Sequence, residues 1–554
     1  MNPLRSFLLL RPTLPLLLLL LLIFSSTWST SSTAGDHNNF LLCLGSRNTT
    51  VSPNSDLIHT PNSASYSSVF QFSIRNTRFN DTAASTRPTA IITPKTISQV
   101  QSAVVCARTH DVQVRVRSGG HDFEGMSYVS TSPSSTQPFL LIDLINLRNV
   151  AVDVPSKSAW VQAGAVLGEV YHGIASASGT LAFPAGICPT VGVGGHVSGG
   201  GYGMLIRKHG IAADNVLDAQ LVDARGRVLD RAAMGEDVFW AIRGGGGNTY
   251  GIVVSWKINL VTVPARLTAF TAVRTSEENV TRVFDRFQHV VDKLPDDLSI
   301  LLTLNTVNYS TAKGKPTATM QAVFQGLYVG ETETLLGVMK QSFPGLELTG
   351  QDCREMSWIQ SILYFAGYPN NATYDELLDS RSSAPVQFDK VKAKSDYVEA
   401  PLPVKVLQGI WKRLYELESG PSFLQIIPHG GMMSRISDSS IPYPHRAGNV
   451  YKIQYYAVWS REGKEVEKRY LDWIRRLYEF TTPYVSKNPR GAYVNSRDLD
   501  LGRNNLGKIT SYRQARIWGE KYYKHNFERL ARAKAAIDPS NFFRNEQSVP
   551  PFTG

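Results

Sequence analysis

The spacing of apolar residues changes repeatedly along the first half of the chain. In VQVRVR (112–117) valines alternate with polar residues, which is the period of a half-buried strand. The run FLLIDLINL (139–147) is typical of a strand buried on both faces, whereas TISQVQSAVVCARTH (96–110) has helical spacing. Further strand patterns lie at 220–230, around a glycine turn, and at 248–264. We therefore predict strands and helices in alternation, with glycine runs at their junctions.

The composition changes after residue 265. Glycine runs disappear, and long polar–apolar stretches such as RLTAFTAVRTS (266–276) and NVYKIQYYAVW (449–459) take their place. Helical spacing in KEVEKRYLDWIRRLYEF (464–480) places five apolar residues on one face: Val466, Tyr470, Trp473, Ile474 and Leu477. We predict an antiparallel sheet covered on one side by helices across 265–489. A last segment, 490–554, carries a helical stretch that Asp538-Pro539 ends.

The N-terminus has the order of a secretory signal peptide, here assigned to residues 1–30. Arg5 and Arg11 precede an unbroken apolar run from Leu16 to Phe24, and small residues follow. A membrane anchor needs about 20 uninterrupted apolar residues, and Arg11 and two prolines interrupt this stretch. We expect cleavage between residues 26 and 35, entry to the secretory route and no membrane anchor afterwards. The final compartment, whether cell wall, vacuole or a vesicle, stays open.

Composition limits the classes of partner. The 554 residues carry a formal net charge of +11, but the basic residues are scattered and no nucleic-acid module is evident. We expect a basic surface suited to an acidic extracellular medium, no nucleic-acid partner and a monomer. A secreted chain also gives meaning to its sequons as candidate glycan sites, at Asn48, Asn80, Asn279, Asn308 and Asn371.

The four cysteines suggest one disulfide and two free thiols. Cys43 and Cys106 both lie early in the chain, and we expect them to pair. Cys353 is interpreted as a small buried apolar residue. Cys188 stands apart, because it lies within a glycine-rich stretch.

Three glycine-rich loops carry the candidate chemistry: RSGGHDFEG (117–125), PAGICPTVGVGGHVSGGGYGM (184–204) and RGGGGNTYG (243–251). Such loops expose consecutive backbone N–H groups and let the backbone approach a flat or anionic ligand. One such loop is weak evidence, but three in one region favour a bound ligand. His121 and Cys188 each lie inside a loop; the alternatives are a core histidine and an inert thiol.

These stretches, together with FWAIRGGGGNTYGIVVSWKI, IPYPHRAGNVYKIQY, PRGAYVNSRDLDLG and DPSNFF, resemble plant berberine bridge enzyme-like oxidases, a branch of the vanillyl-alcohol-oxidase type of FAD-linked proteins. The resemblance spans nearly all of the mature chain. It implies an α+β protein with a two-lobed PCMH-type FAD-binding domain at 35–264, its core at about 85–264. It also implies a substrate-binding domain at 265–489 and a C-terminal segment, 490–554, that completes the FAD-binding domain.

The resemblance further implies FAD bonded at its 8α carbon to His121 and at C6 to Cys188. Two tethers would fix the ring and prevent cofactor loss outside the cell. The family's disulfide matches Cys43 and Cys106, and a small residue at Val191 resembles members that react with O₂. Matching cofactor contacts are Arg117, Ser118, Gly119, Gly120, Thr190, Gly192, Gly194, Gly195, His196, Gly200, Gly201, Gly203, Ile252 and Asn541.

The substrate side departs from the family pattern. Gln454 stands where a base or an amide faces the flavin, and an amide can only hydrogen-bond. Phe123 and Ser496 replace residues that can exchange a proton in relatives. We predict Tyr202 and Gln454 as a polarising pair. The remaining catalytic candidates are Tyr493, Asn495 and Ser496, although Tyr202 and Tyr493 could also serve only in packing.

A site poor in bases suggests substrates whose hydroxyls are acidic, namely phenolic or other aromatic specialised metabolites. The expected reaction is hydride transfer to FAD and reoxidation by O₂, with H₂O₂ as product and oxidative cyclisation or dehydrogenation as outcome. One alternative is a redox-neutral cyclisation or cycloaddition of a prenylated phenolic by positioning alone. Others are a monolignol or carbohydrate oxidase and a non-catalytic wall protein.

Overall fold

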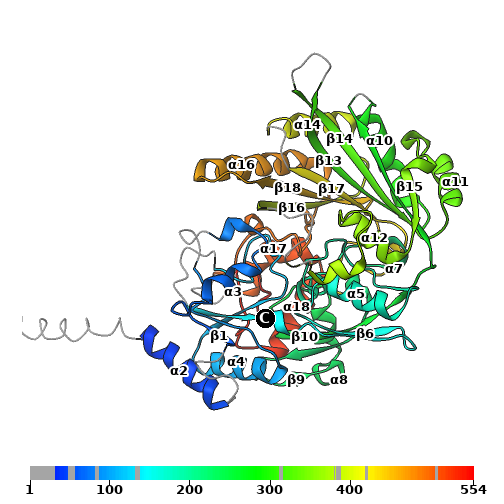
Figure 1. Ribbon diagram of the computed structural model, residues 1–554. Coiled ribbons are helices and arrows are strands. Elements are labelled where there is room, and N and C mark those ends of the chain that lie inside the picture. The colour runs from blue at the N-terminus through cyan, green and yellow to red at the C-terminus, as the bar shows by residue number, and fades with distance from the viewer. Residues whose placement is uncertain are drawn as a thin grey trace, which may run out of the picture.

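The computed structural model describes residues 32–47, 56–80, 86–130, 138–276, 278–310, 316–379, 381, 389–417, 422–505 and 510–553. The expected signal peptide and Asn48 lie outside these residues. Figure 1 shows two tiers, with a large sheet and its helices above and smaller sheets with the C-terminus below. No helix within the described ranges has both the length and the apolar character needed to cross a bilayer.

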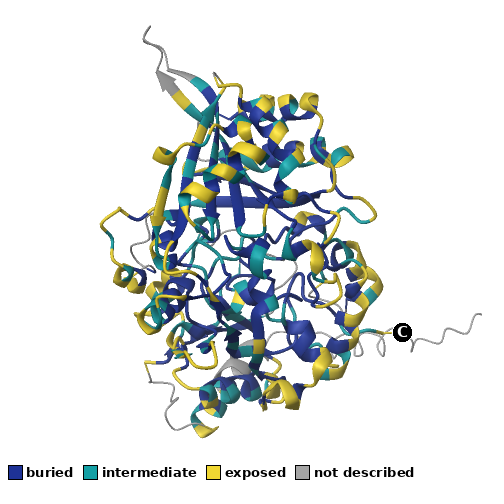
Figure 2. Ribbon diagram, turned by 90° about the vertical axis from the view of Figure 1, so that its right-hand side faces the viewer, coloured by how far each residue is buried: buried dark blue, intermediate teal, exposed yellow. Residues whose placement is uncertain are grey.

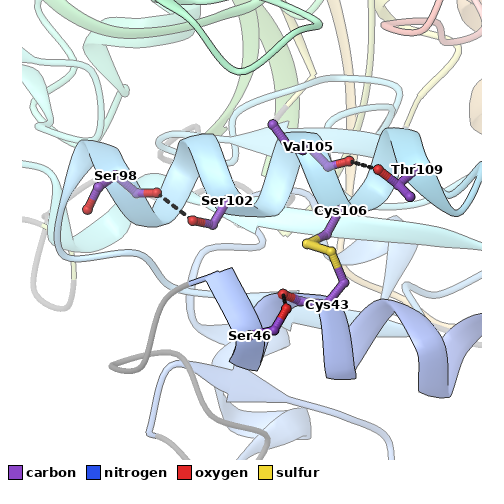
Figure 3. Close-up of a disulfide and its surroundings, with 7 residues drawn as sticks. All are labelled: Cys43, Ser46, Ser98, Ser102, Val105, Cys106 and Thr109. Atoms are coloured by element: carbon purple, nitrogen blue, oxygen red, sulfur yellow. Dashed lines mark hydrogen bonds between the residues drawn. A yellow bond between two sulfur atoms is a disulfide. The ribbon is translucent and has the colours of Figure 1, made fainter.

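The first sheet of the lower tier has the order β1-β2-β4-β3. Its last three strands run parallel and β1 pairs antiparallel. The strands are β1 (Ile58–His59), β2 (Ala90–Ile92), β3 (Gln113–Arg117) and β4 (Phe139–Asp143). Figure 3 shows how a disulfide joins two neighbouring helices, α2 (Ser32–Arg47) and α4 (Ile97–Thr109). The expected Cys43–Cys106 pair is confirmed, with Cα atoms 5.8 Å apart.

The half-buried character expected for 112–117 is wrong, because both arginines of β3 are fully buried. Arg115 forms two hydrogen bonds with the carboxylate of Glu546, at 2.9 and 3.1 Å. Arg117 donates to Asp143 on the neighbouring strand and to the carbonyls of Val69 and Phe70. These partners neutralise both guanidinium groups, so the strand is covered on both faces.

The second sheet of the lower tier is antiparallel, with the order β5-β6-β10-β8-β9. Its strands are β5 (Val150–Asp153), β6 (Ser158–Gln162), β8 (Val216–Val222), β9 (Val228–Leu229) and β10 (Ile252–Asn259). The chain then leaves the sheet, and β11 (Val261–Thr262) pairs with β7 (Leu181–Ala182). The helices here are α3 (Tyr66–Phe72), α5 (Leu167–Ala177), α6 (Val193–Ser198), α7 (Ile206–His209), α8 (Arg231–Met234) and α9 (Glu236–Ile242).

The upper tier is a seven-stranded antiparallel sheet of order β15-β12-β14-β13-β17-β18-β16. Its strands are β12 (Leu267–Thr275), β13 (Leu298–Ser310), β14 (Pro316–Tyr328), β15 (Cys353–Met356), β16 (Lys390–Val398), β17 (Phe423–Pro428) and β18 (Tyr451–Trp459). Four helices cover one face, α10 (Val280–Val290), α11 (Thr332–Ser342), α14 (Val404–Leu414) and α16 (Lys464–Thr481). In Figure 2 the exposed residues gather on the outer sides of these helices. The predicted apolar face of 464–480 is confirmed, with Trp473, Ile474 and Leu477 buried.

The period of two along β18 assigns its side chains to two surroundings. Tyr451, Ile453 and Tyr455 pack in the core beneath the helices. Lys452 and Gln454 point to the opposite face of the sheet, where both line a cavity. The apolar helices on one side therefore force the polar residues of this strand toward the lower tier.

The C-terminal segment returns to the lower tier. There α17 (Tyr512–Tyr523) precedes α18 (Asn526–Ile537), which packs against α9. Lys534 of α18 is fully buried and donates to the carbonyls of Thr249 and Phe543 as well as to Asp538. With the Arg115–Glu546 pair, these bonds join the end of the chain to the first sheet and to a glycine loop. A short helix, α12 (Trp358–Phe365), connects the two tiers beside α5.

Four of the five sequons lie in described residues. Asn279, Asn308 and Asn371 are exposed, and Asn80 is half-buried. Glycosylation of all five stays a prediction.

Candidate active site

A cavity of about 580 Å³ lies where the glycine loops of the lower tier meet the sheet of the upper tier. Its floor comes from loops 118–123, 186–203 and 246–253, and its roof from β13, β16, β17 and β18. Three glycine loops therefore contribute to one hollow, as their composition predicts.

Two of the loops touch through their glycines. A Cβ atom at Gly119 would lie 2.2 Å from the backbone nitrogen of Gly192, and one at Gly192 would lie 2.1 Å from the nitrogen of Gly119. No other residue fits at either position without moving the backbone. The contact holds the loop of His121 beside the loop of Cys188.

His121 and Cys188 meet at one hydroxyl group. Nε2 of His121 lies 2.8 Å from Thr190 Oγ1, and Sγ of Cys188 lies 3.3 Å from the same oxygen. Burial, assisted by the charge of Arg75, lowers the pKa of His121 to about 3, so the imidazole is neutral at physiological pH. The bond at Nε2 leaves Nδ1 as the available nitrogen, and Cys188 is a free thiol.

Most of the predicted site residues line this cavity. They are Ser118, Gly119, Gly120, His121, Phe123, Cys188, Thr190, Val191, Gly192, Gly194, Gly195, His196, Tyr202, Gly203, Ile252, Gln454, Tyr493, Asn495 and Ser496.

Four predicted cofactor contacts lie outside the lining of this cavity, and their contact with FAD stays a prediction. Arg117 is fully buried in its pair with Asp143 and stabilises the first sheet. Gly200 and Gly201 have positive φ angles, and the N–H of Gly201 donates to Tyr493 Oη at 2.8 Å, so this turn positions the tyrosine. Asn541 lies in the turn after α18.

Polar atoms without partners show that the cavity suits a polar guest. Neither side-chain atom of Asn248 has a hydrogen-bond partner in the described part of the chain, and neither does Oγ of Ser496. Both residues are cavity lining. Buried polar groups are normally paired, so a ligand rich in donors and acceptors would satisfy them. With the glycine floor, the neutral imidazole and the thiol, the residues fit FAD.

Tyr202 lies at the centre of an aromatic group. Its ring meets that of Tyr493 edge-on, with centroids 4.8 Å apart, and its Oη contacts Tyr443 and Tyr397. Burial and the neighbouring tyrosines raise the pKa of Tyr202 well above its ordinary value of 10. Asn495 donates to Tyr493 Oη at 3.2 Å and to the carbonyl of His196 at 3.0 Å, so its amide holds Tyr493 in place.

Lys452 is a charged residue of the cavity lining that the sequence analysis missed. Its Nζ lies 4.5 Å from the centre of the Tyr202 ring and 4.4 Å from that of Tyr493. The side chain is buried, and no carboxylate of the described residues lies within 4 Å of it. Burial therefore lowers the pKa of Lys452 well below 10.5. The available signal was a lysine within an inner strand whose other residues, apart from Gln454, are apolar or aromatic.

The predicted pair of Tyr202 with Gln454 is replaced by a different arrangement. Oε1 of Gln454 accepts a hydrogen bond from Lys452 Nζ at 2.8 Å, and it is the lysine that contacts the Tyr202 ring. The cavity therefore contains a titratable amine that the expectation of a site poor in bases did not include. Lys452 and Tyr202 are adjacent titratable groups with opposite pKa shifts, which is the arrangement expected of a proton-accepting couple.

An aromatic wall closes the roof of the cavity. The rings of Phe423 and Tyr456 stack with centroids 4.3 Å apart, and Phe123 meets Tyr456 edge-on at 5.9 Å. Val391 and Val458 belong to the same apolar cluster. The wall therefore offers flat apolar surface close to the couple.

Comparisons with known proteins cover nearly the whole chain. A family model described as "FAD binding domain" matches residues 88–232, and one described as "Berberine and berberine like" matches residues 492–550. Berberine bridge enzyme-like 18 of Arabidopsis thaliana is 47% identical over 523 residues, 94% of each chain. Tetrahydroberberine oxidase of Berberis wilsoniae is 46% identical, over 95% of this chain and 96% of that protein.

A solved structure shares the fold. Phl p 4, a grass pollen allergen with glucose dehydrogenase activity, superposes with a TM-score of 0.85 at 42% identity, covering 93% of this chain and all of that one. The relatives thus match both tiers and the glycine loops of the cavity, and they match the C-terminal segment that packs beneath them. The chain belongs to the berberine bridge enzyme-like family of FAD-dependent oxidases.

Proposed function

We propose that FAD is bonded to this chain twice, through Nδ1 of His121 and Sγ of Cys188. The observation that carries this is the convergence of both side chains on Thr190, at 2.8 and 3.3 Å, across loops that touch through Gly119 and Gly192. The neutral imidazole is nucleophilic at physiological pH. Two bonds would keep the cofactor in a protein that we expect to be secreted.

The attachment is tested with the two free cysteines as a matched pair. Cys188→Ala should leave FAD attached through His121 alone, whereas Cys353→Ala should retain both bonds, because Cys353 lies on β15 outside the cavity. Neither variant should release flavin on denaturation, and only Cys353→Ala should keep the bond through Cys188; release of free flavin from Cys353→Ala, or an unmodified Cys188 in that variant, would contradict the proposal.

We propose that Lys452 and Tyr202 together accept the proton of a substrate hydroxyl. FAD, when bound, accepts the hydride and passes the electrons to O₂. An ammonium at Lys452 stabilises negative charge on Tyr202, and Gln454 fixes the lysine by accepting its hydrogen bond. Val191 lines the cavity, and we expect its small side chain to leave room for O₂ to reach the flavin.

The substrate we propose is a phenolic or other aromatic specialised metabolite. The stack of Phe423 and Tyr456, extended by Phe123, supplies a surface for an aromatic ring. Lys452 of the couple lies on the same strand as Tyr456, and both residues line the cavity, so a ring on the wall would bring its side chain toward a proton acceptor.

Carbohydrate oxidation is the second candidate. A proton acceptor suits an unactivated alcohol, and Phl p 4 has glucose dehydrogenase activity. Redox-neutral cyclisation loses support, since Lys452 supplies the base whose absence suggested it.

A panel of cinnamyl-type alcohols, prenylated phenolics and oligosaccharides, added without air, separates these candidates. Flavin bleaching by the aromatic compounds, with loss of two hydrogens from the product, supports the proposal. Phe423→Ala should raise the KM for aromatic compounds and not for sugars. Bleaching by sugars alone would favour carbohydrate oxidation, and product formation without bleaching would favour cyclisation.

A further inference from the structure

Two buried residues that the proposed reaction does not use lie directly behind Tyr202. Tyr443 contacts the Tyr202 hydroxyl, and His429 Nε2 lies 3.3 Å from Tyr443 Oη. Both side chains are buried, with 2% and 0% of their surface exposed. The three residues therefore form a hydrogen-bonded chain that ends at the proton-accepting couple.

The hydrogen bonds that His429 makes indicate which residue donates at each step of this chain. His429 Nε2 also lies 3.2 Å from the carbonyl oxygen of His445. A carbonyl only accepts, so Nε2 carries the hydrogen and shares it between His445 and Tyr443. The Tyr443 oxygen then accepts from His429, which leaves its own hydrogen available for donation to Tyr202, the hydroxyl that it contacts. Burial lowers the pKa of His429 to about 3, so this tautomer is neutral at physiological pH.

Other titratable groups surround the chain. Tyr202 is also faced by Tyr397 Oη of β16 at 3.3 Å and by Lys452 of β18 and Tyr493. Tyr443 is faced by Arg446, whose charge is paired with Asp214, and His445 stacks on Tyr397 at 3.8 Å. The cations of this shell, Lys452 and Arg446, both favour negative charge on the tyrosine oxygens.

We infer that His429 and Tyr443 are positioning residues that direct a hydrogen-bond donor at Tyr202 and so set the pH at which the Tyr202–Lys452 couple accepts a proton. The donor stabilises the state in which Tyr202 is negative and Lys452 positive, which is the state that receives the substrate proton. Removing it raises the pH needed to reach that state. The inference rests on the proposed role of the couple and not on the identity of the substrate.

The test is the pH profile of anaerobic flavin reduction, with cinnamyl alcohol and glucose as alternative reductants. Hydrogen bonds to charged groups correspond to about a tenfold to hundredfold effect. Tyr443→Phe should therefore slow reduction by that factor at pH 7 and move the acid limb upward by about one to two pH units. His429→Phe should slow it by about fivefold, and His429→Gln, which keeps an N–H donor, should recover most of the loss.

Tyr451→Phe is the matched control. Tyr451 is adjacent to Lys452 but faces the opposite core, where its hydroxyl donates to Gln288 at 2.5 Å. This variant should keep the wild-type pH profile. An unshifted profile in Tyr443→Phe, or equal shifts in Tyr443→Phe and Tyr451→Phe, would overturn the inference.

A second readout requires no substrate. With tyrosine labelled with ¹³C at Cζ, the Tyr202 resonance, assigned by its loss in Tyr202→Phe, should reach the phenolate position at lower pH in the wild type than in Tyr443→Phe. The same midpoint in both would overturn the inference. A different midpoint in Tyr443→Phe would support the hydrogen-bonded chain even if no aromatic compound reduced the flavin. That second result would refute only the proposed substrate class.

Discussion

Replacing Lys452 by methionine removes the charged group of the couple while keeping the length of the side chain. At 4.5 Å from the Tyr202 ring, a unit charge at an effective dielectric of about 20 is worth about 4 kcal/mol to a negative Tyr202. Because 1.36 kcal/mol corresponds to a factor of ten, flavin reduction should slow by about 10²–10³-fold. This lies within the usual range for a general base.

Stability should respond differently from activity. Lys452 pays a burial cost without a carboxylate partner in the described chain, and the loss of its bond to Gln454 opposes the gain from removing it. We expect the free energy of unfolding to change by less than about 2 kcal/mol. Lys394→Met, on the adjacent strand β16, is the contrast, because Lys394 pairs with Asp498 and Asp500 at 2.7 and 2.8 Å. That variant should lose about 3–5 kcal/mol.

The assay is stopped-flow flavin reduction without air, together with denaturant unfolding of both variants. Reduction of Lys452→Met within tenfold of the wild-type rate would refute the role of the lysine. A slow reaction accompanied by unfolding as severe as in Lys394→Met would attribute the loss to structure instead.

Three further predictions concern stability. Arg115→Leu should cost about 3–5 kcal/mol because it removes the guanidinium that pairs with the buried Glu546 carboxylate. In Arg115→Leu with Glu546→Leu part of this stability should return, and equal losses would refute the pairing argument. Cys43→Ala opens a loop of 63 residues and should lower the free energy of unfolding by up to about 4 kcal/mol in the chain-entropy model; an unchanged unfolding midpoint would contradict this. Folding lowers the pKa of His429 from 6.5 to about 3, so this imidazole binds a proton at higher pH in the unfolded chain than in the folded one. The free energy of unfolding should therefore fall as the pH drops below 6.5, by about 3 kcal/mol at pH 4.5. In His429→Gln the acid sensitivity measured by guanidinium unfolding should shrink by a similar amount, and an unchanged sensitivity would count against the argument.

Local sequence patterns predicted the elements whose surroundings are local. The glycine turn at 220–230 joins β8 to β9, and the apolar face of 464–480 packs on the sheet. The glycine-rich stretches also predicted which loops form the floor of the cavity, because close approach of two backbone segments requires glycine wherever it occurs.

Residues with partners far along the chain were misjudged. Alternation in 112–117 suggested exposed arginines, but Arg115 meets Glu546, which lies 431 positions later. Lys452 was overlooked for the related reason that its functional neighbour, Tyr202, lies on another element in the opposite tier. Helical and strand periods report which face a side chain takes and contain no information on what that face meets.

The most direct measurement of the central claim is a protease digest of the denatured protein, followed by mass spectrometry of its yellow peptides. The account predicts one flavin that links the peptide containing His121 to the peptide containing Cys188. Recovery of both peptides at their unmodified masses, with all flavin free in solution, would contradict it.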